Sequence, residues 1–270
     1  MLDITMYCHS LHDKMLSVIQ KVGYVPVGLG DGKFSEEWLK DDNLINISHK
    51  NKYYAEYTFY YWFWKNVLPK VKDNHWIGFC SYRELWGNKK KITESSKFAD
   101  VVLTETPREW EKFDTILGEH IFMNNLKFSK LIKHGLWSLT RNPSALFKSK
   151  RNLRFHFDMW HGNGNLDKAI DFLDDKERED FRKYTRKNVS FNRGNMFVCR
   201  SKKIMNDYFS SIFPWLERCE KIFGFENLDG YNKTRIYGFL GERFMSYWFQ
   251  KNTKYKTMPV IIYDIRKDIS

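Results

Sequence analysis

Residues 46–66 read NISHKNKYYAEYTFYYWFWKN, and residues 75–86 read HWIGFCSYRELW. The first stretch has the length of a helix and is crowded with Tyr, Phe and Trp, whereas the second begins as a short apolar strand and turns polar at Ser81. In an open α/β sheet, ligands bind where parallel strands end. Because Tyr82 and Arg83 follow the strand directly, the two stretches together predict an α/β fold whose site handles an anion.

Short apolar segments alternate with helix-like stretches along the chain. The expected strands are residues 2–8, 24–29, 76–80, 101–104, 195–199 and 260–263, and the expected helices are residues 11–22, 50–67, 107–117, 166–184, 201–223 and 237–251. This alternation is typical of a sheet with helices on both faces. Residues 127–165, rich in Lys, Arg, Asn and Ser, interrupt it and are interpreted either as a lid or acceptor-binding element or as a plain helical insertion.

The start of the aromatic stretch has the chemistry of a helix N-terminus. Asn46 and Ser48 can cap exposed backbone N–H groups, and a helix start of this kind favours an anion. The aromatic residues nearly encircle the helix axis, which indicates burial on several sides. The polar minority, which includes Glu56 and Thr58, is the part of this helix that could serve a site.

The composition is that of one globular domain with excess positive charge. At 270 residues and 42% hydrophobic content, the chain fits a single large α/β domain that folds alone. Lys and Arg number 45 against 33 Asp and Glu, which gives a formal charge of +12 and a pI of about 9.3. Such a charge attracts nucleic acid, phosphorylated ligands or an anionic membrane face, and by itself does not decide among them.

The cysteines and apolar runs bear on the compartment. The chain's cysteines are Cys8, Cys80, Cys199 and Cys219. They are widely separated and form no CxxC pair, so we interpret them as reduced structural residues in a reducing compartment, the cytoplasm. The chain has neither a signal-peptide pattern nor eighteen consecutive apolar residues, so no membrane span is expected. Peripheral contact with the inner face of a membrane stays open, because Trp137 precedes a basic cluster at residues 148–154.

A series of motifs runs from about His9 to Trp248. They are H-S at 9–10, Y-V-P-V-G at 24–28, D-D-N-x-x-N-I-S-x-K-N at 41–51, E-x-T-x-x-Y-W-x-W-K-N at 56–66, I-G-x-x-x-Y-R at 77–83, G-N-M-F-V at 194–198 and G-F-L-G-E-R at 238–243. This order resembles a large bacterial family of predicted glycosyltransferases from capsule and O-antigen gene clusters, some of whose related domains are galactofuranosyltransferases.

The resemblance implies a fold and a reaction. The fold would be one GT-A-like domain over residues 1–270, with a nucleotide-binding half at about 1–125 and an insertion plus acceptor and catalytic half at about 126–270. The reaction would move a sugar from a nucleotide sugar to a surface polysaccharide or a lipid-linked glycan acceptor, with inversion at the anomeric carbon. UDP is the favoured carrier and galactofuranose the favoured sugar, both from the relatives.

The resemblance also bears on metal use. Many GT-A enzymes place Asp-x-Asp at the strand end that here reads Ser81-Tyr82-Arg83, and those carboxylates hold a divalent metal. Arg83 can neutralise the leaving diphosphate instead, so we expect metal-independent transfer without a cofactor, with Mn²⁺ or Mg²⁺ as the alternative. The alternative is that Arg83 pairs with Glu84 or another carboxylate. Many family members read H-Y-R-R here, so Ser81 and Glu84 depart from the pattern and leave the donor sugar open.

Glu242 is the candidate general base. Leu240, Phe244 and Trp248 form a stripe along their helix, and Glu242 lies off that stripe, where it can face a cleft. Inverting enzymes of the resembled class commonly place an acidic residue here to take the acceptor proton. The alternative role of Glu242 is an ion pair with Arg243 or Arg235, and Asp229 is the reserve catalytic candidate.

Further candidates surround these two. The candidate nucleotide-sugar contacts are His9, Asp42, Asn46, Lys50, Tyr82, Arg83, Asn195 and Arg243, and the candidate acceptor contact is His161. Asp41, Asp42 and Asn46 could instead be turn and cap residues. Gly194, before Asn195, would allow close passage of the backbone beside the donor sugar, or simply make a tight turn.

Two other functions remain open at this stage. A basic chain rich in aromatics is compatible with nucleic-acid binding, although the aromatics concentrate in apolar helices and no recognised nucleic-acid motif is present, so no nucleic-acid partner is expected. The Ser81 and Glu84 departures are also compatible with a non-catalytic family member that binds nucleotide or glycan.

Overall fold

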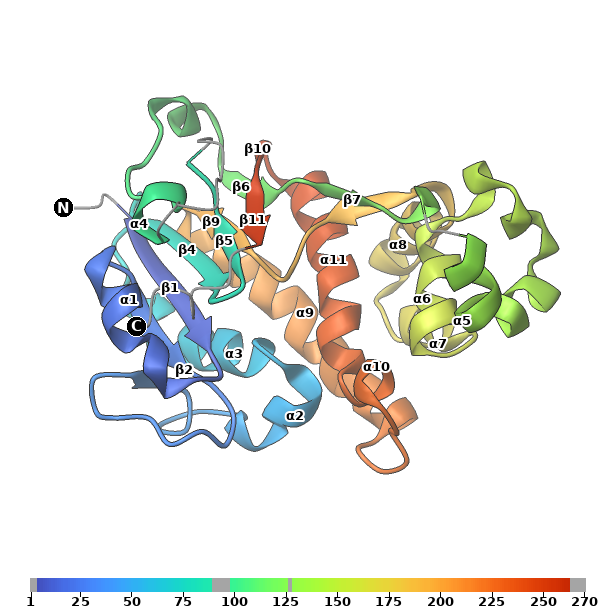
Figure 1. Ribbon diagram of the computed structural model, residues 1–270, viewed down its shortest axis with the longest axis horizontal. Coiled ribbons are helices and arrows are strands. Elements are labelled where there is room, and N and C mark those ends of the chain that lie inside the picture. Colours follow the sequence, from blue (N-terminus) through green and yellow to red (C-terminus); the bar gives the residue numbers. More distant parts are fainter. Residues whose placement is uncertain (1–3, 89–97, 126–127, 263–270) are drawn as a thin grey trace.

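The computed structural model describes residues 4–88, 98–125 and 128–262. Its centre is a seven-stranded sheet with the order β10-β6-β9-β4-β1-β2-β3 (Figure 1). In that order the strands are Tyr255–Met258, Thr115–Gly118, Phe197–Cys199, Trp76–Ser81, Ile4–Ser10, Val25–Gly28 and Leu39–Lys40. Strand β9 is antiparallel to both β4 and β6, whereas the other neighbouring strands pair in parallel. The start of β9 therefore meets the carboxyl ends of the other strands.

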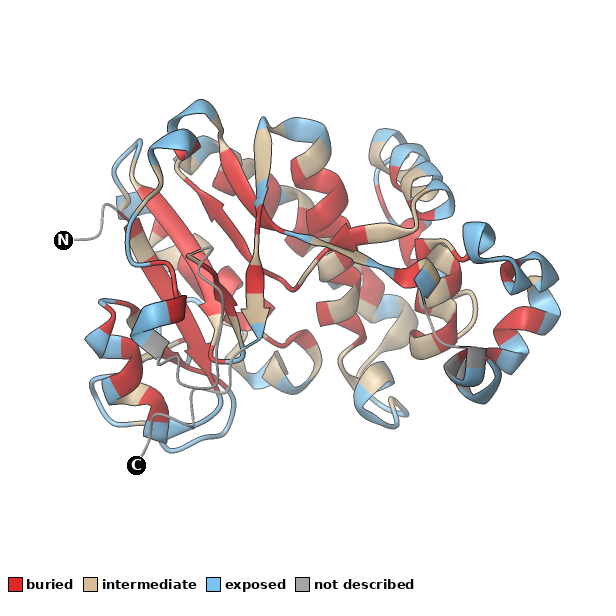
Figure 2. Cartoon of the chain, turned by 45° about the horizontal axis from the view of Figure 1, so that its top comes forward, coloured by how far each residue is buried: buried red, intermediate tan, exposed pale blue. Residues whose placement is uncertain are grey.

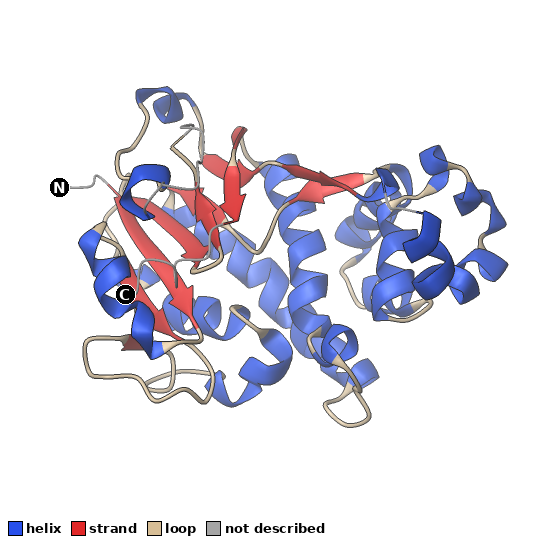
Figure 3. Ribbon diagram, viewed as in Figure 1, coloured by secondary structure: helices blue, strands red, loops and turns tan. Residues whose placement is uncertain are grey.

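Side chains along a strand point alternately to the two faces of the sheet, and successive residues of β1 and β4 are buried. Both faces of the sheet are therefore covered (Figure 2). Tyr7 of β1 and Phe79 of β4 point into a large aromatic core beneath α3 (Tyr57–Asn66), α9 (Lys202–Phe223) and α11 (Ile236–Asn252). Their neighbours Cys8 and Cys80 point into a second core beneath α1 (Leu16–Lys21). The helices therefore cover both faces (Figure 3), which confirms the predicted α/β class. No helix in the described ranges combines the length and apolarity needed to cross a membrane.

A helical lobe projects from the sheet beyond α11 (Figure 1). Two antiparallel strands, β7 (His120–Phe122) and β8 (Ser190–Asn192), form its stem. The lobe contains α5 (Phe128–Arg141), α6 (Leu153–His161), α7 (Asn165–Ile170) and α8 (Asp175–Lys187). The expected insertion at residues 127–165 is thus helical in its described part. It also extends further, because α7 and α8 belong to the same lobe.

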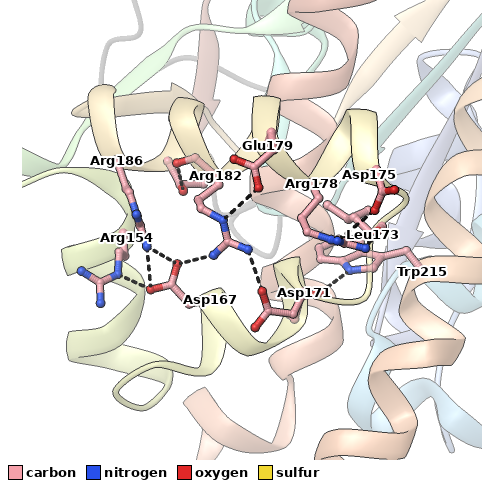
Figure 4. A network of polar contacts seen from close by, with 12 residues as sticks. Arg154, Asp167, Asp171, Leu173, Asp175, Arg178, Glu179, Arg182, Arg186 and Trp215 are labelled. Atoms are coloured by element: carbon pink, nitrogen blue, oxygen red, sulfur yellow. Dashed lines mark hydrogen bonds and ion pairs between the residues drawn. The ribbon is translucent and has the colours of Figure 1, made fainter.

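Ion pairs join the helices of this lobe (Figure 4). Asp167 of α7 lies 2.6 Å from Arg154 of α6 and 3.4 and 3.3 Å from Arg182 and Arg186 of α8. The indole of Trp215 on α9 donates a 2.7 Å hydrogen bond to the carbonyl of Ala169. The network holds α6, α7 and α8 together, and the Trp215 bond ties the lobe to the sheet half.

The structure corrects several expected elements. Residues 101–104 are not a strand, because α4 (Phe98–Val101) ends there and Val102 makes only an isolated bridge to Gly87. Residues 107–117 are not one helix, because a 3-10 turn at Arg108–Lys112 leads into strand β6. The helix expected at residues 11–22 is shorter, as α1. The helix expected at residues 166–184 is divided into α7 and α8. Strands β3, β5 (Glu84–Trp86), β6, β7, β8 and β10 had not been expected.

The aromatic helix expected at residues 50–67 is broken in the middle. It forms α2 (Asn51–Tyr54) and α3, and Ala55 between them has a φ of 54°. This left-handed conformation is unfavourable for a residue with a Cβ and persists only where the surroundings impose it. The Asn51 side chain donates a 3.0 Å hydrogen bond to the Ala55 carbonyl, and α2 packs directly against α11. Glu56 follows this break directly, and its side chain lines the main cavity of the protein.

Close approach of α11 to α3 yields a stability prediction. A Cβ at Gly241 would overlap the buried ring of Tyr57. Gly241→Ala gains about 0.5–1 kcal/mol from helix propensity, but overpacking costs about 1–3 kcal/mol, so we expect a net loss of about 1–2 kcal/mol. Chemical denaturation measures it, with Glu217→Ala at an exposed position of α9 as the control. A variant as stable as the wild type would contradict this packing.

Candidate active site

A cavity of about 480 Å³ opens at the edge of the sheet where β1, β2 and β4 end and β9 begins. The strand register places His9 beside Ser81 and Ser10 beside Gly28. The far side of the cavity is built by the turn before β9 and by the start of α11. Its principal polar lining residues are His9, Asn51, Glu56, Ser81, Tyr82, Arg83, Glu84, Asn195, Arg235 and Glu242. The fold therefore gathers these groups from distant parts of the chain.

His9 contributes a neutral imidazole to the cavity. Its ring is buried against Phe59 and Tyr60, with centroid separations of 5.0 and 5.5 Å. Burial lowers the pKa of His9 to about 3, so the ring carries no charge at neutral pH. Within the described part of the chain, its Nε2 atom has no hydrogen-bond partner. A buried polar atom without a partner is costly, and a ligand hydroxyl could satisfy it.

The end of β4 presents a single exposed cation. Ser81 Oγ accepts a 3.1 Å hydrogen bond from the backbone of Glu84, which holds the turn. Arg83 Nε donates to the Tyr82 hydroxyl at 2.6 Å, and the guanidinium lies 5.0 Å from the Tyr82 ring centroid. Among the described residues, Arg83 has no carboxylate within ion-pair distance, whereas Glu84 lies 3.8 Å from Arg193. The guanidinium of Arg83 is thus oriented by Tyr82 and available to an anion.

The turn before β9 holds Glu242. The backbone N–H of Gly194 donates to Glu242 Oε1 at 3.1 Å, and the second oxygen lies 2.6 Å from Arg243 Nη1. Gly194 has a φ of 67°, and a Cβ there would lie 2.8 Å from Glu84 Oε2. Glycine is therefore required both by the conformation and by the approach of the Glu84 carboxylate.

The surroundings of Glu242 make it a weak acid. Burial raises the pKa of Glu242 to about 7, the Arg243 guanidinium acts in the opposite direction, and the charges of Glu84 and Glu56 raise it further. Glu84 is itself affected: burial raises its pKa, and Arg193 opposes the shift. A carboxyl group that titrates near neutral pH can take up a proton during a reaction. Glu242 both lines the cavity and pairs with Arg243, so the foreseen ion pair is present, and the role of Glu242 as a general base stays a prediction.

Asn195 and Glu56 form the third part of the site. The Asn195 amide donates to Glu56 Oε1 at 2.8 Å and to the Gly238 carbonyl at 3.3 Å. Glu56 Oε2 also lies 4.0 Å from Arg235. The side-chain oxygen of Asn195 is buried and has no partner among the described residues. The sequence pattern marks Glu56 only as a polar residue in an aromatic helix. The break at Ala55, after which Glu56 lines the cavity, has no local sequence signal.

Six of the expected site residues do not line the cavity: Lys50, Asp42, Asn46, Asp229, Arg243 and His161. Lys50 pairs with Glu220 at 2.6 Å, and the exposed Asp42 pairs with Lys40 at 3.3 Å. Asn46 donates to the carbonyls of Asn43 and Leu44 and accepts from Ser48, as a turn residue does. Asp229 lies exposed in the loop between α9 and α10 (Tyr231–Thr234). The structure does not bring the first four of these six residues together with His9, Arg83 and Glu242.

Arg243 and His161 lie behind the cavity wall. Arg243 is 3% exposed, with its guanidinium 4.4 Å from the ring centroid of Phe191. His161 stacks on Phe239 with centroids 4.1 Å apart, and its Nδ1 lies 2.9 Å from the carbonyl oxygen of Asn232. Burial first, and the nearby Arg243 charge second, lower the pKa of His161 to about 3. Phe239, on which His161 stacks, lines the cavity, whereas Arg243 and His161 do not.

The cysteines and possible metal ligands complete the survey of reactive groups. All four cysteines are free and buried, which confirms that they pack as small apolar groups. In residues 4–88, 98–125 and 128–262, no group of three or more His, Cys, Asp and Glu side chains has an arrangement that could hold a metal ion.

Fold and site together define an α/β protein with a polar cavity at its strand ends. The chain belongs to the family described as a domain of unknown function, DUF4422, whose model matches residues 4–253. No curated protein matches the sequence. Among solved structures, the apo form of the bifunctional glycosyltransferase WbbM is similar, with 19% identity and a TM-score of 0.64. The match covers 96% of this chain and 45% of that one, so this chain spans less than half of WbbM, and the likeness is one of fold.

The cluster of carboxylates yields a titration prediction. With ¹³C-labelled glutamate side chains, we expect one carboxyl to titrate near pH 7 and to vanish in Glu242→Gln. In Glu84→Gln that titration should move to lower pH, because a neighbouring negative charge has been removed. Glu217→Gln, on an exposed face of α9, is the matched control and should leave it unchanged. The electrostatic account fails if every glutamate titrates below about pH 5.5.

Proposed function

We propose that this protein is a glycosyltransferase that moves a sugar from a nucleotide sugar to a glycan acceptor. One observation carries the proposal: Glu242, a buried carboxyl with a pKa of about 7, and Arg83, a guanidinium without a carboxylate partner among the described residues, line the same cavity at the strand ends. Sugar transfer needs a base for the acceptor hydroxyl and a cation for the leaving diphosphate. The fold shared with WbbM supports the proposal.

The proposed chemistry is a single displacement. Glu242 removes the proton from the acceptor hydroxyl as that oxygen attacks the anomeric carbon from the face opposite the leaving group. The bond between the anomeric carbon and the diphosphate oxygen breaks, and the nucleoside diphosphate leaves with its negative charge against Arg83. Arg243 holds the Glu242 carboxylate at 2.6 Å and positions it, while the Gly194 N–H fixes the other oxygen. The outcome would be inversion.

Recognition of the donor would fall to neutral groups. His9 Nε2 and Asn195 Oδ1 are buried in the cavity wall without partners among the described residues, and they suit sugar or ribose hydroxyls. Arg83 stands at the strand end where a metal-dependent enzyme needs carboxylates, which supports metal-independent transfer. The family resemblance favours UDP-galactofuranose as donor, a surface polysaccharide or lipid-linked glycan as acceptor, and action in the cytoplasm.

Replacing Glu242 tests the catalytic role. Glu242→Gln should lower release of UDP from its sugar donor by about 10²–10⁴-fold while leaving donor affinity unchanged, because only proton transfer is lost. Wild-type turnover should rise with pH through about 7, since the base acts as the carboxylate. Glu217→Gln is the control. Unchanged turnover in Glu242→Gln would remove this residue from the reaction.

Replacing Arg83 tests the donor site. Arg83→Ala should weaken UDP binding about 10- to 100-fold in calorimetry, because a hydrogen bond to a charged group contributes about 1.5–3 kcal/mol. Arg108→Ala removes the same charge from an exposed position before β6, at the opposite edge of the sheet, and should have no effect. Binding that survives EDTA agrees with the proposal, whereas a requirement for Mn²⁺ contradicts its metal-free part. Tight single-stranded nucleic-acid binding without nucleotide affinity would favour the alternative function instead.

A further inference from the structure

The outer helix of the lobe, α5, exposes large apolar side chains to solvent. Trp137 is 76% exposed, Leu136 57% and Ile132 43%. Immediately after α5, the 3-10 turn at Pro143–Leu146 packs against it, and Leu146 and Phe147 are 51% and 71% exposed. Soluble proteins seldom gather so many exposed large apolar residues in one short segment unless that surface binds something.

Helix geometry shows why these side chains face away from α6. Leu131 and Leu139 of α5 are buried against Phe155 and Met159 of α6, and they form the inner stripe. Ile132 and Leu136, four residues apart, form a second row outside that stripe. Lys133, Trp137 and Arg141 form a third row at the same spacing, and all three are exposed. The outer face of α5 therefore carries an apolar row beside a row in which Trp137 lies between two cations.

The chain segment that carries this face has charges of one sign. Residues 120–157 contain no Asp or Glu and eight Lys or Arg, which is most of the excess of the whole chain, whose net charge is +12. Two of the eight are occupied, because Arg154 pairs with Asp167 and the buried Arg151 bonds to backbone carbonyls. Four others, Lys133, Arg141, Lys148 and Lys150, are exposed beside the apolar residues.

We propose that this surface, Ile132, Lys133, Leu136, Trp137, Arg141 and residues 146–150, binds an anionic lipid bilayer. Trp and large apolar side chains partition into the boundary between headgroups and acyl chains, and Lys and Arg beside them contact acidic headgroups. A second copy of the chain is a poor occupant, because two surfaces of the same positive charge would meet. An acidic protein would pair with the cations but would not account for the row of exposed apolar side chains.

A series of side-chain contacts leads from this surface to the cavity. Helix α6, which buries the inner stripe of α5, ends at His161. His161 contacts Phe239 and Asn232, and Phe239 lines the cavity. Contacts therefore run from the helix that carries this surface to the wall of the cavity. Membrane binding itself follows from the surface and does not depend on the proposed glycosyl transfer.

Vesicle sedimentation tests this inference. The full chain should pellet with vesicles of phosphatidylglycerol and phosphatidylcholine at low salt, and at least about tenfold less with phosphatidylcholine alone. Trp137→Ser with Phe147→Ser, and separately Lys133→Glu with Lys148→Glu, should each reduce the partition coefficient at least about tenfold. These side chains are exposed, so thermal unfolding should stay unchanged.

Matched controls separate the surface from general charge and hydrophobicity. Lys14→Glu with Lys21→Glu makes the same charge change beside α1, at the other end of the molecule (Figure 1), and should leave binding unchanged. Leu44→Ser with Ile262→Ser removes two exposed apolar residues elsewhere and should also have no effect. Equal loss in control and surface variants overturns the inference, as does binding to nucleic acid or protein without vesicle binding. UDP affinity, measured on the same variants, reports separately on the proposed function.

Discussion

The buried carboxylate of Glu242, held between the Gly194 N–H and the Arg243 guanidinium, is the contact on which the site depends. It joins the turn before β9 to the middle of α11. That meeting is possible because β9 runs against its neighbours, so its first residues lie at the edge where the parallel strands end. A parallel strand in the same place would carry Gly194 to the opposite edge of the sheet, and Glu242 would lose the donor that fixes one of its oxygens.

The same wall of the cavity depends on how closely α11 approaches the aromatic helices. Gly238 lies against Tyr54 and Ala55, and Gly241 lies against Tyr57, so two glycines without Cβ atoms let the backbones come together. The approach coincides with the positive φ at Ala55, where α2 ends two residues before α3 begins at Tyr57. The break and the close packing together bring Glu56 and Glu242 into the lining of one cavity, where the charge of Glu56 contributes to the raised pKa of Glu242.

Sequence patterns predicted the parts of the fold that are determined locally. Strands β1, β2, β4 and β9 are apolar runs bounded by turns, and α9 and α11 have clear helical periodicity, so both kinds were located correctly. The predictions for residues 101–104 and 107–117 were wrong because a short apolar run fits a helix or a strand equally well. In residues 107–117, pairing with β9 and β10 makes the last part a strand, β6. Arg83 follows an apolar strand and Glu242 lies off the apolar stripe of its helix, and both line the cavity as those patterns predicted. Their roles in a reaction stay predictions. Lys50 was misplaced because its partner, Glu220, lies 170 residues away in the sequence.

Most of the excess positive charge of the chain lies in the lobe rather than around the cavity. Three carboxylates, those of Glu56, Glu84 and Glu242, line the cavity against the cations Arg83 and Arg235, whereas residues 120–157 carry positive charge without any acidic residue. Under the proposed function, Arg83, which Tyr82 orients at the strand end, would contact the diphosphate, and the carboxylates would contact hydroxyl groups. Under the proposed membrane binding, the positive charge of residues 120–157 would act on an anionic bilayer through the lobe. Because the two groups of charges lie on different parts of the fold, attraction to an anionic surface need not compete with recognition of a small ligand.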